Sequence, residues 1–198
     1  MTVERILNRT AGPASEPVTT AEVKKHLEIL ATDSTHDTAL DELVKAAREQ
    51  FEHDTGYALL TQTHTLSMSR FPTNGNWNDL DVIPLEIRPV SAITSITYYD
   101  TDNAQQTLAT TVYGLDAAAR LIYLKYNQEW PSITPQYLGI QITMTTGYGS
   151  AAAVPNFAKQ AILLQVGEWF DPNMRRGGVD AYERLQRRIA TPSYIDYV

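Results

Sequence analysis

The sequence contains no cysteine, and this absence excludes several kinds of chemistry at once. Disulfide bridges, thiolate catalysis and cysteine-based metal sites all require that residue. The sequence also has no apolar run approaching the ~20 residues that a membrane-spanning helix requires. The N-terminal residues lack the apolar segment of a secretion signal, so we expect the chain to remain in the cytoplasm in which it is made.

Basic residues are in the minority. The chain has 16 Lys and Arg against 23 Asp and Glu, which gives a formal net charge of −7. A surface that binds nucleic-acid phosphates needs a concentration of Lys and Arg, so the overall balance argues against such a role. With 198 residues, 43% of them hydrophobic and 20% charged, the chain has enough apolar material for the core of one soluble domain.

Histidine is also scarce, and its spacing does not favour a metal site. No two of the four histidines are separated by four residues on one predicted helix, and only His53 and His64 flank the same predicted turn. Because zinc needs about four ligands and cysteine is absent, surface or capping histidines are the favoured interpretation. The four residues are His26, His36, His53 and His64.

Catalytic motifs are missing as well. The sequence has no Gly-x-Ser-x-Gly elbow, no phosphate-binding Walker loop and no Gly-x-Gly-x-x-Gly. Acid pairs such as Asp79 with Asp81 lie where solvated charge is expected, and a general acid/base pair would need burial to separate the two pKa values. We therefore predict no catalytic, cofactor-binding or metal-binding residue, and no enzymatic activity.

The N-terminal third has the pattern of two helices. Residues 1–17 show no periodicity and are expected to form a flexible arm. Thr19 and Glu22 have the spacing of a capping box, and the stripe of apolar residues that follows leaves Lys24 on the solvent side. A second helix is predicted to end near Gly56, because glycine readily takes the left-handed C-cap conformation. Its apolar face comprises Leu40, Leu43, Val44, Ala47 and Phe51.

The middle of the chain changes to the pattern of strands. Residues 60–146 are rich in Thr, Ile, Val and Tyr, with turn residues between short runs. No alternation of strands and helices occurs there, so we expect an antiparallel β section. The predicted strands are Thr61–Arg70, Asp81–Leu85, Ala92–Tyr99, Leu121–Leu124 and Leu138–Thr145.

The C-terminal part returns to helix. Pro155 suits a first helical turn, and a broadly apolar helix follows it, with a further short helix indicated by Tyr182, Leu185 and Ile189. Helices over 19–56 and 155–190 cannot bury their apolar faces separately. We therefore predict an α+β fold: a small helical bundle of N- and C-terminal helices with an inserted antiparallel β section, in one domain over 18–190 with a tail at 191–198.

Two C-terminal features are candidates for partner binding. Arg184, Arg187 and Arg188 would share one helix face, which is either a solvated face near the helix C-terminus or a docking surface for an acidic partner or DNA. The last residues include Tyr194, Ile195 and Tyr197, which form either a frayed end or an arm that binds a partner with alternate side chains. We favour the arm.

Several short motifs, taken in order, resemble the head–tail connector (adaptor) proteins of long-tailed double-stranded DNA phages and related gene-transfer particles. The resemblance covers about residues 16–170. The motifs are Glu16-Pro17-Val18-Thr19 before Val23-Lys24-Lys25-His26-Leu27, then Ala46-Ala47-Arg48-Glu49, Glu52 and Thr55-Gly56, then Leu60-Thr61-Gln62-Thr63, Arg88-Pro89-Val90, Ile93, Ile96, Tyr98-Tyr99, Thr146-Gly147-Tyr148-Gly149, Val154-Pro155 and Lys159-Gln160-Ala161-Ile162-Leu163-Leu164.

The resemblance implies a helical bundle with a β insertion and a role in the neck of the virion. Copies would form a ring, of twelve subunits, beneath the portal protein. The ring would extend the channel through which double-stranded DNA passes without specific binding, and would dock a stopper or tail protein. Neither a membrane nor a cofactor is implied.

Two other functions stay open at this point. Another neck component, such as a stopper or tail-end protein, is usually dominated by β structure, and the helices at both ends of this chain count against it. A hydrolase with a carboxylate site in the β section would need two acids converging in an apolar pocket.

Overall fold

The computed structural model describes residues 5–72, 81–134 and 136–170, which divide into two compact units. One unit comprises Met1–Pro13 and Thr61–Gly147, and the other comprises Ala14–Leu60 and the chain from Tyr148 onward. Helices and antiparallel sheets are both present, so the predicted α+β class is confirmed. The predicted single domain over 18–190 and the tail at 191–198 extend beyond the described residues and stay predictions.

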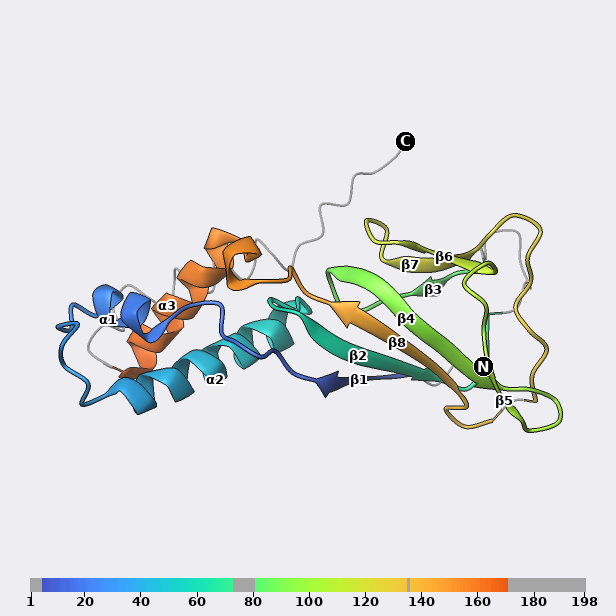
Figure 1. Ribbon diagram of the computed structural model, residues 1–198, viewed down its shortest axis with the longest axis horizontal. Helices are drawn as coiled ribbons and strands as arrows, with labels where there is room; N and C mark the ends of the chain where they lie inside the picture. The colour runs from blue at the N-terminus through green and yellow to red at the C-terminus, as the bar shows by residue number, and fades with distance from the viewer. Residues whose placement is uncertain (1–4, 73–80, 135, 171–198) are drawn as a thin grey trace. The chain divides into compact units, whose positions relative to one another are not determined.

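The second unit is helical (Figure 1). Helix α2 packs against both α1 and α3, so helices from the two ends of the sequence share one core, as expected. No described helix is long and apolar enough to cross a bilayer. Its elements are α1 (Thr20–His26), α2 (Asp37–Thr55), the 3₁₀ turn η1 (Ala151–Ala153) and α3 (Asn156–Phe170).

Local signals set the helix ends. The backbone amide of Thr19 donates to Glu22 Oε2 at 2.7 Å, and the Glu22 amide donates to Thr19 Oγ1 at 3.2 Å, so the predicted capping box is present. Gly56 ends α2 with φ 67°, in the left-handed region, and its amide donates to the Glu52 carbonyl at 2.9 Å. Lys24 differs from expectation: it is buried and forms a salt bridge with Asp37 at the start of α2.

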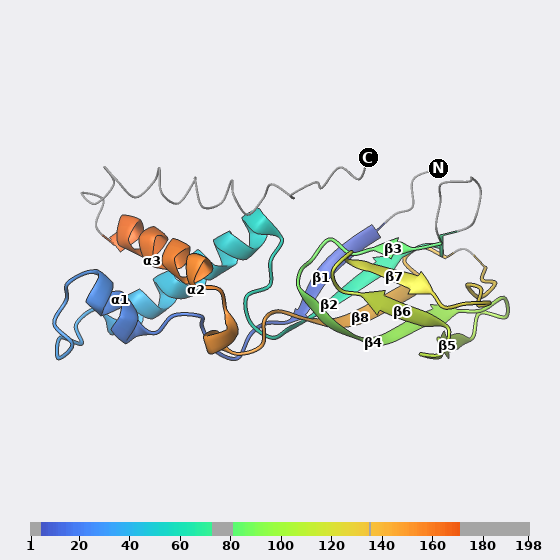
Figure 2. The ribbon, with the colours of Figure 1, turned by 90° about the horizontal axis from the view of Figure 1, so that it is seen from above.

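The first unit contains two antiparallel sheets. Figures 1 and 2 together show the smaller sheet as a second layer on one side of the larger. The larger sheet has the order β1 (Arg5–Ala11), β2 (Gln62–Met68), β8 (Ile140–Thr146), β4 (Val90–Tyr99) and β5 (Gln105–Thr107), and the smaller has the order β3 (Ile83–Pro84), β7 (Leu121–Leu124) and β6 (Tyr113–Asp116).

Alternation along the central strands builds the core of this unit. In β2 and β8 every second side chain is buried, and these side chains all point to the same face because paired residues in an antiparallel sheet share a face. Ile83 and Ile122, which pair between β3 and β7, are also buried. The buried set on β2 and β8 is Gln62, His64, Leu66, Met68, Ile140, Ile142, Met144 and Thr146.

The N-terminal segment corrects one expectation. Residues 1–17 were expected to form a flexible arm, but Arg5–Ala11 forms β1 and pairs with β2 from Arg5↔Met68 to Ala11↔Thr63. Strands β5 and β6 were not predicted either, whereas the five predicted strands are all present, Leu121–Leu124 with the predicted ends and the other four with shifted ends. The missed strands are short or mostly exposed, so their own sequences carry little apolar alternation and pairing alone fixes them.

Candidate interaction surfaces

The residues predicted to bind a partner lie outside the described residues. This applies to the arginines of the predicted last helix and to the aromatic and aliphatic residues of the tail. Their proposed role therefore stays a prediction. The six residues are Arg184, Arg187, Arg188, Tyr194, Ile195 and Tyr197.

The described β unit offers no pair of buried acids. All its described carboxylates are at least partly exposed. The Ala104 amide and the Gln106 side chain donate hydrogen bonds to Asp100 and lower its pKa, so it is a turn carboxylate that stays charged. Within the described ranges, no three His, Asp or Glu side chains are grouped as metal ligands would be. The described acids of this unit are Asp81, Glu86, Asp100, Asp102, Asp116 and Glu129.

A buried arginine organises one side of the helical unit. Arg48 is only 2% exposed, and its Nε donates to Glu16 Oε2 at 2.7 Å while its Nη1 donates to Glu52 Oε2 at 2.9 Å. Burial alone would lower the pKa of Arg48, but the hydrogen bonds and charges of the two glutamates outweigh burial and raise it. Glu52 also accepts the Leu59 amide at 2.8 Å. The cluster thus joins three segments of chain and is structural.

A groove of about 410 Å³ lies between α1 and α3 in the same unit. Val18 and Leu163, both buried, contribute its apolar wall, and Lys25 and Lys159 contribute positive charge. Hydrogen bonds from Thr19 lower the pKa of Glu22 at the rim, and the nearby charge of Lys159 acts in the same direction. The groove thus combines an apolar wall with charges of both signs.

The larger sheet presents a face without formal charge, which we call the hydroxyl face. Pairing across β1, β2, β8 and β4 aligns its side chains in three rows of four, none of them buried. Seven of the twelve are Ser or Thr, in a chain of which 20% is charged. The rows are Ile6–Ser67–Gln141–Thr97, Asn8–Thr65–Thr143–Ser95 and Ala11–Thr63–Thr145–Ala92.

The two edges of this sheet are open over part of their length. Among the described residues β1 pairs only with β2, so its outer edge has no strand beside it. β5 covers β4 only from Thr97 to Tyr99, which leaves the outer edge of β4 without a paired strand over 91–95. Unpaired backbone amides and carbonyls on an exposed edge are a template for a strand of another chain.

The sequence predicted only part of the hydroxyl face, namely the outward residues of β8. The alternation of Gln141, Thr143 and Thr145 with buried residues was the signal for the outward face of β8. The rows became visible only through pairing with β1, whose role as a strand the sequence did not reveal. The open edges depend on strand order, which a single sequence does not specify.

Comparison with protein families and with curated proteins finds no match: no family model fits the chain and no curated protein matches it. The likeness to solved structures is therefore the only comparison that bears on this chain.

Three solved structures of gene transfer agent (GTA) particles contain a chain with a similar fold. The first is the neck of an empty GTA particle, computed with C6 symmetry: TM-score 0.73, 22% identity, covering 96% of this chain and 98% of that chain. The second is the neck of a native GTA particle, computed with C12 symmetry: TM-score 0.71, 24% identity and the same coverage. The third is the virion of a native GTA particle: TM-score 0.69, 24% identity and the same coverage again. At these identities the likeness establishes that this chain has the same fold as those chains, including both its helical and its β unit.

Proposed function

We propose that this protein is a structural subunit of the neck of a phage-like particle, and specifically the head–tail adaptor. Copies form a ring beneath the portal, extend the DNA channel and present a surface to the next neck or tail protein. The protein acts in the virion, between capsid and tail, and not as an enzyme.

The likeness to GTA neck chains is the observation that carries this proposal. The likeness spans 96% of this chain and 98% of the similar chain. It therefore extends over both units and is not limited to a substructure that many folds share. Those necks were computed with sixfold and twelvefold symmetry, which supports a ring of repeated subunits. The net charge of −7 is compatible with a channel wall that does not hold DNA.

The exposed described acids of the β unit favour this role over the hydrolase considered from the sequence. A carboxylate that holds a proton near neutral pH needs an apolar, buried environment. The pKa of Asp100 is lowered by hydrogen bonds, which is the opposite direction. A stopper or tail-end protein is the remaining alternative within the neck.

The test is to mix the purified chain with its cognate portal protein and to image the product by electron microscopy. We expect an additional ring of density on the portal with the portal's rotational symmetry. Portal alone, with the chain omitted, is the control. A portal whose density is unchanged at saturating chain concentration would contradict the adaptor role.

The same assay separates the adaptor from a stopper. An adaptor binds the portal directly, whereas a stopper binds only once an adaptor ring is present. Binding that requires another neck protein would keep the chain in the neck but assign it to the next layer.

A further inference from the structure

The two open edges lie on opposite sides of the larger sheet: β1 is the first strand of its order, and β4 extends beyond the short last strand β5. Among the described residues, β1 (Arg5–Ala11) has a paired strand on one side only, and the outer edge of β4 has no paired strand over 91–95. Neither stretch contains a proline, which would remove an amide donor. We propose that β1 of one copy pairs with the open edge of β4 in the next copy, so that the sheet continues from subunit to subunit. This inference rests on the ring of the proposed function.

Strand direction supports pairing between these two edges. β1, β2, β8 and β4 are each antiparallel to their neighbours, so β1 and β4 run in opposite directions. Copies related by a rotation about an axis along the strands keep their strand directions. Because the repeating set from β1 to β4 has four strands, an even number, β1 of the next copy then lies antiparallel to β4, and the alternation continues unbroken. An odd number of strands would have produced a parallel junction.

β5 fixes the register of the junction. Without a shift, the three rows of the hydroxyl face would run straight on and would place Ile6 of the next copy beside Thr97. Thr97 is already paired with Thr107 of β5, so that position is occupied. The nearest register that keeps side chains on the same face places Ile6 beside Ser95 and Asn8 beside Ala92. A constant shift of this kind tilts the strands, as closure of a sheet into a cylinder requires.

Charge and strand shape are compatible with this junction. The hydroxyl face carries no formal charge on either edge, so adjacent copies meet without like-charge repulsion. The arginines of β1 point to the opposite face, where Arg5 donates to the Pro84 carbonyl. β4 has two register shifts against β8, between Val90 and Ala92 and between Ile93 and Ser95. Such bulges bend a strand, and curved sheets use them.

Cysteine cross-linking tests the junction directly, because the natural chain has no thiol. Two double variants place thiols at the proposed neighbours: Asn8→Cys with Ala92→Cys, and Ile6→Cys with Ser95→Cys. Each is assembled on the cognate portal, oxidised, and separated on a denaturing gel without reductant. We expect a ladder of covalent multimers that ends at the ring number and collapses to monomer when reductant is added.

Single variants supply the matched control. In a head-to-tail junction Asn8 meets Ala92 and never another Asn8, so each single variant should remain monomeric on the gel. A covalent dimer from Asn8→Cys alone would indicate β1 paired with β1 across a twofold axis, and would overturn the proposal. Asn8→Cys with Asp102→Cys, a thiol in the exposed turn before β5, should give no ladder.

The outcomes distinguish this inference from the function on which it rests. Rings seen by electron microscopy with no ladder from either double variant would overturn the edge junction and leave the adaptor role intact. The bulges of β4 would then serve to prevent strand pairing at a solvated edge. Absence of rings from the natural chain would contradict both. Circular dichroism of each variant checks that its fold is retained.

Discussion

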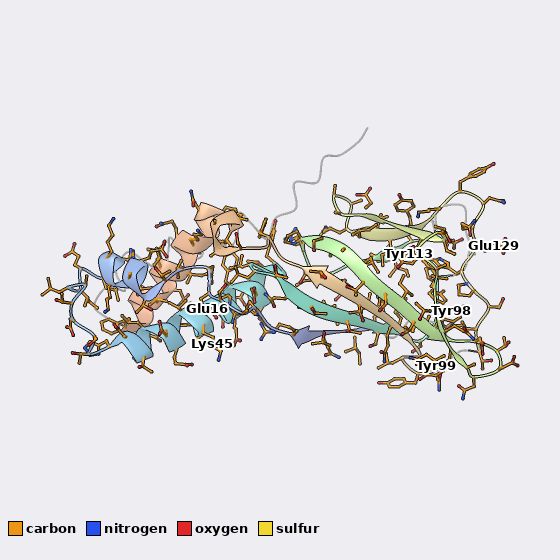
Figure 3. All side chains as sticks on the ribbon, viewed as in Figure 1. Glu16, Lys45, Tyr98, Tyr99, Tyr113 and Glu129 are labelled. Carbon is orange, nitrogen blue, oxygen red and sulfur yellow. The ribbon has the colours of Figure 1, made fainter. Side chains whose placement is uncertain are left out.

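Arg48 holds Glu16 through two hydrogen bonds, from Nε to Oε2 at 2.7 Å and from Nη2 to Oε1 at 3.3 Å. Glu16 lies in the segment that was expected to be a flexible arm, and Figure 3 shows it alongside α2. A paired carboxylate and guanidinium of this kind fix geometry as well as charge. The segment before α1 is therefore anchored to α2, and the anchor is 2% exposed at Arg48.

Removing this anchor should destabilise the helical unit. Arg48→Met would leave Glu16 and the nearly buried Glu52 without their cation, and breaking one side of a buried ion pair costs about 3–5 kcal/mol. Urea unfolding followed by circular dichroism measures the loss. Lys45→Met, on the exposed side of the same helix, is the control and should change stability by less than about 0.5 kcal/mol. Equal effects of the two substitutions would show that the cluster contributes nothing specific.

The capping box at α1 predicts a smaller, pH-dependent loss. Thr19→Ala removes the side chain that accepts the Glu22 amide and should cost about 1 kcal/mol. Hydrogen bonds from Thr19 lower the pKa of Glu22 below its ordinary value of 4.5, so the contribution of the cap is present above pH 4.5 and fades as the pH falls below that value.

Thr38→Ala, an exposed threonine in the first turn of α2, is the matched control for that substitution. Thermal unfolding of both variants at pH 7 and at pH 3.5 measures the effect. The Thr19 backbone amide still donates to Glu22 in the variant, so a Thr19→Ala deficit that is the same at both pH values would argue against the hydrogen bond from the Thr19 hydroxyl to the Glu22 carboxylate.

His64 predicts a loss of stability in mild acid. Burial, and then the nearby charge of Arg9, lower the pKa of His64 below its ordinary value of 6.5. The unfolded chain therefore binds this proton more readily than the folded chain, and stability present above pH 6.5 is lost as the pH falls. Each unit of lowering corresponds to about 1.4 kcal/mol.

His64→Gln isolates that contribution, because glutamine can still bond to Thr146 Oγ1, which lies 2.9 Å from His64 Nδ1. Unfolding free energies at pH 7.5 and pH 5.5 are compared for the two proteins. We expect the natural chain to lose more stability between these pH values than the variant. Equal losses would place the acid sensitivity elsewhere.

The predicted tail gives a test of partner docking. Deletion of residues 191–198 should leave a folded protein that no longer binds the portal, because the aromatic and aliphatic side chains of the tail are proposed to form the contact. A variant in which the eight residues 191–198 are replaced by a glycine-serine segment of the same length is the control for chain length. Unchanged portal binding by either variant would remove the tail from the interface.

The sequence predicted the helices better than the sheet edges. The stripe from Leu40 to Phe51 and the cap at Gly56 are local signals, and the structure confirms both. The outward face of β8 was also local, since Gln141, Thr143 and Thr145 alternate with buried neighbours. β1 was missed because its own sequence has little apolar alternation, and its strand conformation depends on pairing with distant residues, as Asn8 pairs with Thr65. Strand order, and with it the open edges, depends on pairings of that kind.

The pairing of β1 with β2 has a consequence for synthesis. Arg5 leaves the ribosome well before its partner Met68, and α1 and α2 lie between the two strands in the chain. The central partner of both β2 and β4 is β8, which is made later still. Contacts between distant residues close slowly, so nascent β1 must wait unpaired while most of the sheet is translated. During that interval the backbone of β1 is a template for pairing with a strand of another chain.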